Sequence, residues 1–145
     1  MRVSDILSPS VVTVDLGASL AEAVGKMLDD DVGSAVVTDD GVPGAMITEH
    51  DVLDATYQTD EPLSSIPVRA AASAPLVTIG PSASARRAAE EMDDHGVHRL
   101  VVVDGLDVVG VVSTTDLIRN YTGIREDERK RADAEYEWLT REEMR

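Results

Sequence analysis

The stretch RLVVVDGLDVVGVVSTTDLI, residues 99–118, holds two valine-rich runs separated by Asp104-Gly105. Such runs on either side of an Asp-Gly turn predict two strands joined as a hairpin. Ser113 ends the second run and Asp116 follows three residues later, which predicts a helix that begins just after Ser113. The basic pair His98-Arg99 stands where the first strand begins. The polar groups at the two ends of the hairpin therefore raise the question of a shared ligand site.

The same pattern occurs earlier in the chain. A shift of 65 positions aligns residues 3–57 with residues 68–122 without a gap and pairs Asp51 with Asp116. A repeat of this regularity indicates a duplicated structural unit. Further identical pairs include Ser8/Ser73, Val12/Val77, Thr13/Thr78, Ser19/Ser84, Met27/Met92, Val36/Val101 and Asp39/Asp104.

Each copy predicts the order β-α-β-β-α. A short β-run (11–14 or 76–79) precedes a helix capped by Ser19 or Ser84, then come two strands and a last helix. One unit buries too little surface to be secure alone, so we expect both to share one core in a single pseudo-symmetric domain. The predicted fold class is α/β (α+β), with repeat 1 over 1–57, a linker over 58–67 and repeat 2 over 68–122.

The composition restricts the partners. The chain of 145 residues has a formal charge of −15 and 43% hydrophobic residues but no Phe, so its core must use Val, Leu, Ile, Ala and Met. A surface this acidic repels nucleic acids and anionic membranes, and we expect neither as a partner. A high-salt cytoplasm would explain the acidity, because Asp and Glu keep a surface hydrated. An acidic protein adapted to ordinary salt is the alternative.

Several chemistries have no support in the sequence. The absence of cysteine excludes a disulfide framework and thiolate metal sites, and three histidines give no credible transition-metal set. The acidic runs 29–31 and 93–95 are interpreted as solvated surface. No nucleophile, base and orienting group occur at a recognisable spacing, so we expect no catalysis. We find no long apolar run or signal peptide and expect a cytoplasmic protein.

The doubled unit resembles the CBS-domain pair, also called a Bateman module. The resemblance covers residues 1–122 and is carried by VSDIL or VRAAA before the first β-run, a helix of small residues, and the ending G-h-h-[ST]-x-x-D-h-h, where h is hydrophobic. The second copy has the full ending, GVVSTTDLI (110–118), whereas the first has AMITEHDVL (45–53), with Ala45 in place of the glycine. HRLVVVD (98–104) is similar to nucleotide-sensing CBS repeats of the AMP-activated kinase gamma subunit.

The resemblance implies a function as well as a fold. Such pairs form two clefts that commonly bind AMP, ADP, ATP or S-adenosylmethionine, and they regulate attached or partner proteins. They often assemble as disc-like homodimers. We therefore expect an adenosine ligand, no required cofactor, a homodimer and a protein target. A ligand-free interaction module is the alternative from another class.

The resemblance also assigns residues to the clefts. Asp116 and Asp51 lie where the family has its ribose-binding aspartate. An aspartate suits this role because its carboxylate presents two acceptors to the adjacent hydroxyls of a ribose. Each could instead only favour the dipole of the helix that follows. Ser113 and Thr115, and less strongly Thr114, would face the nucleotide, with Thr48 in the first copy. Val77, Thr78 and Thr13 lie on strands that line the adenine slot, although an ordinary strand explains them equally well.

His98 and Arg99 are expected to contact phosphate and to border the Asp116 cleft, with an ion pair to Asp93 or Asp94 as the alternative. The first copy has Gly33-Ser34 at the equivalent positions and His50 in place of Thr115. We therefore predict that the cleft around Asp51 lacks the basic pair and that it binds phosphate weakly, stays empty or takes a less anionic ligand.

Residues 123–145 lie outside the repeat and predict a charged helix. Glu126/Lys130, Asp127/Arg131 and Glu137/Arg141 are spaced to pair along a helix, and Ala132, Tyr136 and Leu139 form a narrow apolar stripe beside Trp138. An isolated helix of this kind is marginal, so we expect it to dock on a partner subunit, its own module or a target. A solvated, fraying tail is the alternative.

Overall fold

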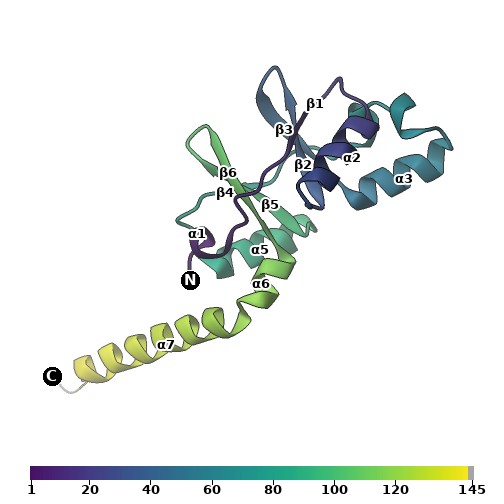
Figure 1. Ribbon diagram of the computed structural model, residues 1–145. Helices are drawn as coiled ribbons and strands as arrows, with labels where there is room; N and C mark the ends of the chain where they lie inside the picture. Colours follow the sequence, from purple (N-terminus) through teal and green to yellow (C-terminus); the bar gives the residue numbers. More distant parts are fainter. Residues whose placement is uncertain (144–145) are drawn as a thin grey trace.

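The computed structural model of the chain describes the backbone of residues 1–143 and the side chains up to residue 137. The first repeat contains α1 (Val3–Ile6), β1 (Thr13–Asp15), α2 (Leu20–Asp29), β2 (Ser34–Asp39), β3 (Val42–Thr48) and α3 (Glu49–Thr59). The 3-10 helix η1 (Leu63–Ser65) leads to the second repeat, with α4 (Val68–Ala71), β4 (Thr78–Ile79), α5 (Ala85–His95), β5 (Arg99–Asp104), β6 (Asp107–Ser113) and α6 (Thr114–Arg119). Helix α7 (Tyr121–Glu143) follows and extends away from the body (Figure 1).

Each repeat forms one three-stranded sheet. The strand orders are β1-β2-β3 and β4-β5-β6, with the first pair parallel and the second antiparallel. In the first hairpin, Asp40 and Gly41 have φ values of 53° and 80°, as a tight turn that follows the strand twist requires. The mixed α/β fold with two repeats is confirmed.

The predicted helix starts are also confirmed. Ser19 and Ser84 cap α2 and α5, with side chains that accept from the backbone N–H groups of Glu22 and Arg87. Thr48 and Ser113 cap α3 and α6 in the same way. The first strands are shorter than the β-runs predicted, because only Thr13–Asp15 and Thr78–Ile79 pair with the neighbouring strands.

The buried residues form two clusters rather than the one shared core that we expected. One lies between α2, α3 and the first sheet, and the other between α5 and the second sheet. Val36 on β2 and Val101 on β5 belong to neither cluster, although their exposed fractions are only 1% and 0%. Because side chains alternate along a strand, these valines lie on the sheet faces turned away from the helices. The centres of those faces are therefore buried as well, whereas Thr13 and Thr78, their partners on the first strands, are exposed.

Two short segments cross between the repeats. Residues 1–8 carry Val3 and Ile6 into the core of the second repeat, and residues 66–73 carry Ile66 and Val68 into the core of the first. Backbone hydrogen bonds hold both, from Val3 N to Ala83 O and from Leu20 N to Ile66 O, each 2.8 Å long. We call residues 1–8 and 66–73 the crossing segments.

The far ends of the crossing segments pair with the sheets. Ser8 exchanges two backbone hydrogen bonds of 2.9 Å with Val111, and Ser73 exchanges bonds of 2.9 and 3.0 Å with Met46. At the first contact, a β-carbon on Gly110 would stand 2.6 Å from the Ser8 carbonyl oxygen. Glycine at residue 110 therefore permits this close approach. Both contacts bring a crossing segment beside the strand that leads to an aspartate-bearing helix.

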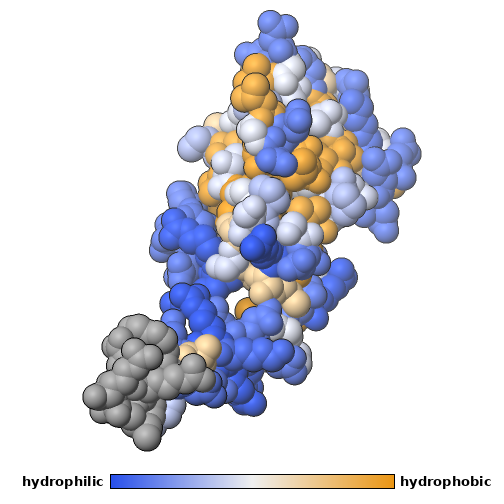
Figure 2. Space-filling model, turned by 90° about the vertical axis from the view of Figure 1, so that its left-hand side faces the viewer, coloured by the Kyte–Doolittle hydropathy of each residue, from blue (hydrophilic) through white to orange (hydrophobic). Residues whose placement is uncertain are grey.

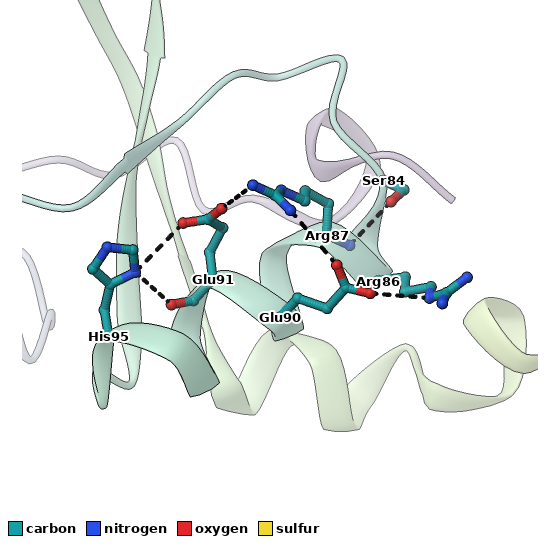
Figure 3. Close-up of polar contacts among 6 residues, drawn as sticks. All are labelled: Ser84, Arg86, Arg87, Glu90, Glu91 and His95. Carbon is teal, nitrogen blue, oxygen red and sulfur yellow. Dashed lines mark hydrogen bonds and ion pairs between the residues drawn. The ribbon is translucent and has the colours of Figure 1, made fainter.

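The outer face of α5 carries a chain of ion pairs (Figure 3). Arg86 pairs with Glu90 at 3.2 Å, and Arg87 pairs with Glu91. His95 lies at the end of the chain, where its Nδ1 is 2.9 Å from the Glu91 carbonyl oxygen. Exposed pairs of this kind stabilise a helix only modestly, so this face supports α5 rather than forming a site.

Helix α7 begins on the second repeat and then leaves it. Ile124 packs against the core cluster, the amino group of Met1 pairs with Asp127, and Arg86 lies 3.8 Å from Glu128. The first turns therefore dock on the chain's own module. Figure 2 shows apolar surface over the two-repeat body, whereas the visible part of α7 is hydrophilic. The predicted contributions of Trp138, Leu139 and Arg141 lie outside the described side chains.

The described helices include none that could cross a membrane, since the long ones carry too many charged residues.

Candidate functional site

Two clefts lie at equivalent places in the two repeats. The Asp51 cleft has a volume of about 460 Å³ and is lined by Met46, Thr48, His50, Asp51, Ser73, Pro75, Leu76, Val77, Val97, His98 and Arg99. The Asp116 cleft has a volume of about 530 Å³ and is lined by Ser8, Ser10, Asp31, Val32, Gly33, Ser34, His98, Arg99, Val111, Ser113, Thr114, Thr115, Asp116 and Arg119. Both volumes are in the range of small-molecule sites.

Each cleft is built from both repeats. One repeat supplies the end of its last strand and the first turn of the helix that follows, with the aspartate. The other repeat supplies the start of its central strand, β5 or β2. A crossing segment forms a third wall, through Ser73 in the Asp51 cleft and through Ser8 in the Asp116 cleft. Any change in how the repeats pack would therefore reshape both clefts.

The two aspartates cap their own helices. Asp116 Oδ2 accepts from the backbone N–H of Ser113 at 2.8 Å and from its hydroxyl at 3.0 Å, while Ser113 Oγ accepts from the N–H of Asp116. Asp51 and Thr48 form the same reciprocal pair, with 2.9 and 3.0 Å to Asp51 Oδ2. Both aspartates therefore have a structural role beyond the interaction with the helix dipole that we left open: each completes a capping box, which uses one of its carboxylate oxygens.

The second oxygen distinguishes the clefts. Asp51 Oδ1 accepts a hydrogen bond of 3.3 Å from the hydroxyl of Ser73. Asp116 Oδ1 has no such partner among the described residues, although Ser8 occupies the position equivalent to Ser73. Helix capping and ligand binding are consequently compatible at Asp116, because each function can use a different oxygen.

The basic pair lines both clefts. His98 and Arg99 border the Asp116 cleft, as predicted, together with Ser113 and Thr115. They also line the Asp51 cleft, so our prediction that this cleft lacks the basic pair is wrong. The error came from assigning the pair to one side of its strand, whereas β5 is the central strand of its sheet and has a cleft on each side.

Arg99 is uncommitted within the chain. Its side chain forms no ion pair or hydrogen bond with another described residue, which contradicts the alternative of a pair with Asp93 or Asp94. It is partly buried, and no carboxylate of the described residues lies within ion-pair distance, although that of Glu49 stands on the other side of the space beside Gly33. A partly buried guanidinium without a partner favours binding of an external anion, since its donors otherwise depend on water.

The remaining predicted residues are divided among several places. Thr114 turns toward the strand, where its hydroxyl donates to the His98 carbonyl oxygen at 3.2 Å, and Thr115 is exposed at the mouth of the Asp116 cleft. Val77 lines the Asp51 cleft, not the Asp116 cleft of its own repeat. Thr78 is exposed one residue further on, and Thr13 lines a separate hollow near Lys26.

Sequence reasoning missed the crossing segments as cleft walls. Ser8 and Ser73 are identical under the repeat alignment, which was a signal, but their distance along the chain from the aspartates concealed the contact. It also missed Asp31 and Arg119, which line only the Asp116 cleft. No motif marks either residue.

The charges of the clefts differ in kind. The Asp51 cleft holds one carboxylate and one guanidinium, together with the imidazoles of His50 and His98. The Asp116 cleft has two carboxylates, from Asp31 and Asp116, two guanidiniums, from Arg99 and Arg119, and the imidazole of His98. Both clefts thus offer cationic side chains to an anionic ligand, in a protein that is strongly acidic overall. Among the described residues, no three acidic or histidine side chains gather as a set of metal ligands.

Comparison with known proteins agrees with this arrangement. The CBS domain family model matches residues 3–57 and 66–123, the two repeats of the structure. An uncharacterised protein of Methanocaldococcus jannaschii is 30% identical over 131 residues, which cover 81% of this chain but only 31% of that longer protein. The CBS domain-containing protein YhcV of Bacillus subtilis is 33% identical over 119 residues, covering 81% of this chain and 84% of YhcV.

A solved structure gives the same fold with a ligand. The CBS domain protein of Pyrobaculum aerophilum complexed with AMP has a TM-score of 0.72 and 30% sequence identity, and the match covers 81% of this chain and 90% of that one.

Proposed function

Since this chain belongs to the CBS domain family, we propose that it is a regulatory module that binds adenosine nucleotides in its clefts. AMP, ADP or ATP would bind without being transformed, and the module would act on a protein partner rather than catalyse a reaction. We place it in the cytoplasm, where such nucleotides circulate. The observation that carries the proposal is the Asp116 cleft, in which an uncommitted carboxylate oxygen and an uncommitted guanidinium border one cavity.

These two groups match the two ends of a nucleotide. The free Oδ1 of Asp116 can accept from a ribose hydroxyl, and the fork of Arg99 can donate to a phosphate. The hydroxyl of Thr115 and the guanidinium of Arg119 lie on the same wall and add donors. The AMP complex of the 30% identical relative supports this class of ligand.

S-adenosylmethionine is the second candidate, and one residue favours it. Asp31 also lines the Asp116 cleft, where its carboxylate would attract the positive sulfonium or ammonium group of that ligand. Arg99 and Arg119 would oppose those groups. The two candidate ligands therefore differ in which charged side chains of the cleft they use: a nucleotide would use the guanidiniums, and S-adenosylmethionine would use the carboxylate of Asp31.

Signalling requires more than binding. A ligand shifts a conformational equilibrium only if it binds one arrangement better than another. Because each cleft has walls from both repeats, a ligand that contacts both walls would favour one angle between them. We propose this angle as the variable that a partner protein reads.

We also propose that two copies form a homodimer through α3 and α6. Leu53 and Ile118 lie at equivalent positions of these helices, with exposed fractions of 69% and 70%. Each is followed by a charged residue, Asp54 on α3 and Arg119 on α6. Opposite charges beside equivalent apolar residues favour α3 of one copy against α6 of the other, a contact that a twofold axis makes twice.

Thermal unfolding tests the nucleotide proposal. The melting temperature is measured with AMP, ADP, ATP or S-adenosylmethionine, at low and at molar salt, because a halophilic protein would need salt to fold fully. At one hundred times the dissociation constant, binding adds about 2.7 kcal/mol of stability. Asp116→Asn should reduce this gain, and Asp107→Asn, on the exposed hairpin turn, should not. No shift with any adenosine compound would leave a ligand-free interaction module as the better explanation.

A further inference from the structure

We propose that Arg99 couples the two clefts antagonistically, so that a phosphate bound in one withdraws the guanidinium from the other. This inference rests on the proposed nucleotide function. It adds that the clefts compete for one cation rather than act independently. The observation behind it is that Arg99 and His98 line both cavities.

The backbone explains how one pair reaches two clefts. Arg99 lies opposite Ser113 in the β5–β6 register, and the Thr114 N–H donates to the His98 carbonyl oxygen at 2.9 Å. These contacts hold the start of β5 beside the Asp116 cleft. On its other side, the Val101 N–H donates to the Val77 carbonyl oxygen at 3.0 Å, and Val77 lines the Asp51 cleft. The start of β5 is thus a wall between the cavities.

The guanidinium occupies space that a missing side chain leaves open. A β-carbon on Gly33 would stand 3.0 Å from Arg99 Nη2 and 3.2 Å from Glu49 Oε1. Gly33 lines the Asp116 cleft, and Glu49 begins the helix that carries Asp51. Arg99 therefore extends from its own strand to the region where the two repeats meet, and glycine at residue 33 permits it.

The repeat does not supply a second residue of this kind. The position equivalent to Arg99 is Ser34, and the position equivalent to His98 is Gly33. A serine side chain is too short to cross in return, so the cation that serves both cavities comes from one repeat only. The two repeats therefore have the same fold but differ in the side chains at the start of the central strand.

One shared cation implies competition between anions. When a phosphate pairs with Arg99 from one side, a second phosphate on the other side meets a neutralised guanidinium and a like charge. Arg119 still serves the Asp116 cleft, whereas the Asp51 cleft has only His50 and His98 besides Arg99. Filling the Asp116 cleft should therefore weaken phosphate binding in the Asp51 cleft, and linkage requires the reverse effect to be equal.

Isothermal titration with AMP on the full chain measures this coupling. Asp51→Ala and Asp116→Ala each leave one intact cleft and give the affinity of the other alone. We expect the second AMP to bind the wild-type chain about fivefold or more weakly than these affinities predict for independent clefts. If only one AMP binds the wild type but each variant still binds one, the antagonism is complete.

Variants at the shared cation provide the control. Arg99→Gln should weaken both clefts and reduce the coupling to the repulsion between the two phosphates, whereas Arg119→Gln should weaken only the Asp116 cleft and leave the coupling in place. Gly33→Ala keeps the charge and shifts Arg99 Nη2 by only a few tenths of an ångström, so it should still bind AMP and change the coupling less than Arg99→Gln does. Adenosine, which lacks phosphate, should fill both clefts independently.

Two outcomes would overturn the inference. Wild-type affinities equal to those of the single-cleft variants, undiminished coupling in Arg99→Gln, or coupling with adenosine as strong as with AMP would show that Arg99 does not link the clefts, while leaving the nucleotide function intact. Absence of AMP, ADP or ATP binding to the wild-type chain would instead refute the proposed function, and the coupling with it.

Discussion

The hydroxyl of Ser73 donates to Oδ1 of Asp51 over 3.3 Å, so the carboxylate that faces the Asp51 cleft already has a partner from a crossing segment. Asp116 keeps the corresponding oxygen available among the described residues. Each cleft has its own helix-capping aspartate, and the two clefts differ in how many oxygens of that aspartate a ligand can use.

Ser73→Ala should therefore raise the affinity of the Asp51 cleft for AMP. Removing the hydroxyl frees a carboxylate oxygen for a ribose. The loss of a long hydrogen bond to a charged group corresponds to about a fivefold change in the affinity for AMP. Titration of AMP into the Asp116→Ala background isolates this cleft. Ser8→Ala in the Asp51→Ala background is the matched control and should leave the affinity within about twofold, as expected from the absence of the equivalent bond. A loss of affinity in Ser73→Ala would mean that the hydroxyl contacts the ligand instead.

Ser113→Ala should destabilise the protein by about 0.5–2 kcal/mol, because Ser113 caps α6 and also donates to Asp116. Urea unfolding measures the change. Thr115→Ala, at the exposed mouth of the same cleft, should change stability by less than about 0.5 kcal/mol. Equal effects of the two substitutions would argue against a capping role.

Leu100→Ala should cost about 2–5 kcal/mol, since this side chain is fully buried in the second core cluster. Leu106→Ala, at the hairpin tip with an exposed fraction of 97%, should cost less than about 0.5 kcal/mol. The same denaturation measurement compares them. A small effect of Leu100→Ala would contradict the packing described for β5.

Leu53→Glu should produce a monomer if α3 and α6 form the dimer contact. A buried glutamate would face an apolar surface and lie beside Asp54, so the charges would repel. Sedimentation equilibrium gives the mass, and Leu106→Glu, at an even more exposed position on a hairpin tip, should remain dimeric. A wild-type chain that is monomeric at high concentration would refute the arrangement.

Acid should loosen the start of α7. The hydrogen bond from the Met1 amino group, and its positive charge together with that of Lys130, hold the pKa of Asp127 below its usual range, against a smaller desolvation effect. A lowered folded-state pKa means that the contribution is complete above the unfolded pKa and is lost as pH falls through the folded value. The protection of α7 amides against exchange, relative to the intrinsic rate at each pH, should fall below about pH 4 in the wild type. In Asp127→Asn this protection should already be low at neutral pH, and no difference between the two proteins would exclude this contact as an anchor.

The local structure followed closely from the sequence, and the long-range contacts did not. Ser19, Ser84, Thr48 and Ser113 cap helices as predicted, because capping depends on a few adjacent residues. The assignment of Val77 and Arg99 to clefts required knowing which repeat lies across from which strand. Periodicity along one strand carries no information on that question.

The candidate site shows the same division. The carboxylates were predicted from the repeated ending, and the sharing of Arg99 between clefts was not. Glycine at residue 33 leaves room for the guanidinium, and the sequence displays this glycine without connecting it to residue 99. A departure from symmetry in one repeat can therefore change the site of both.

Because of the crossing segments, a chain cut at the boundary between the two sequence repeats would not give two complete cores. A fragment of residues 1–57 would carry Val3 and Ile6, which complete the other core, and would lack Ile66 and Val68, which complete its own. Two such fragments could satisfy each other only by exchanging their first segments, as domain-swapped subunits do. The intact chain is thus an intramolecular form of a swapped dimer, and a single-repeat ancestor built this way would have existed only as a pair.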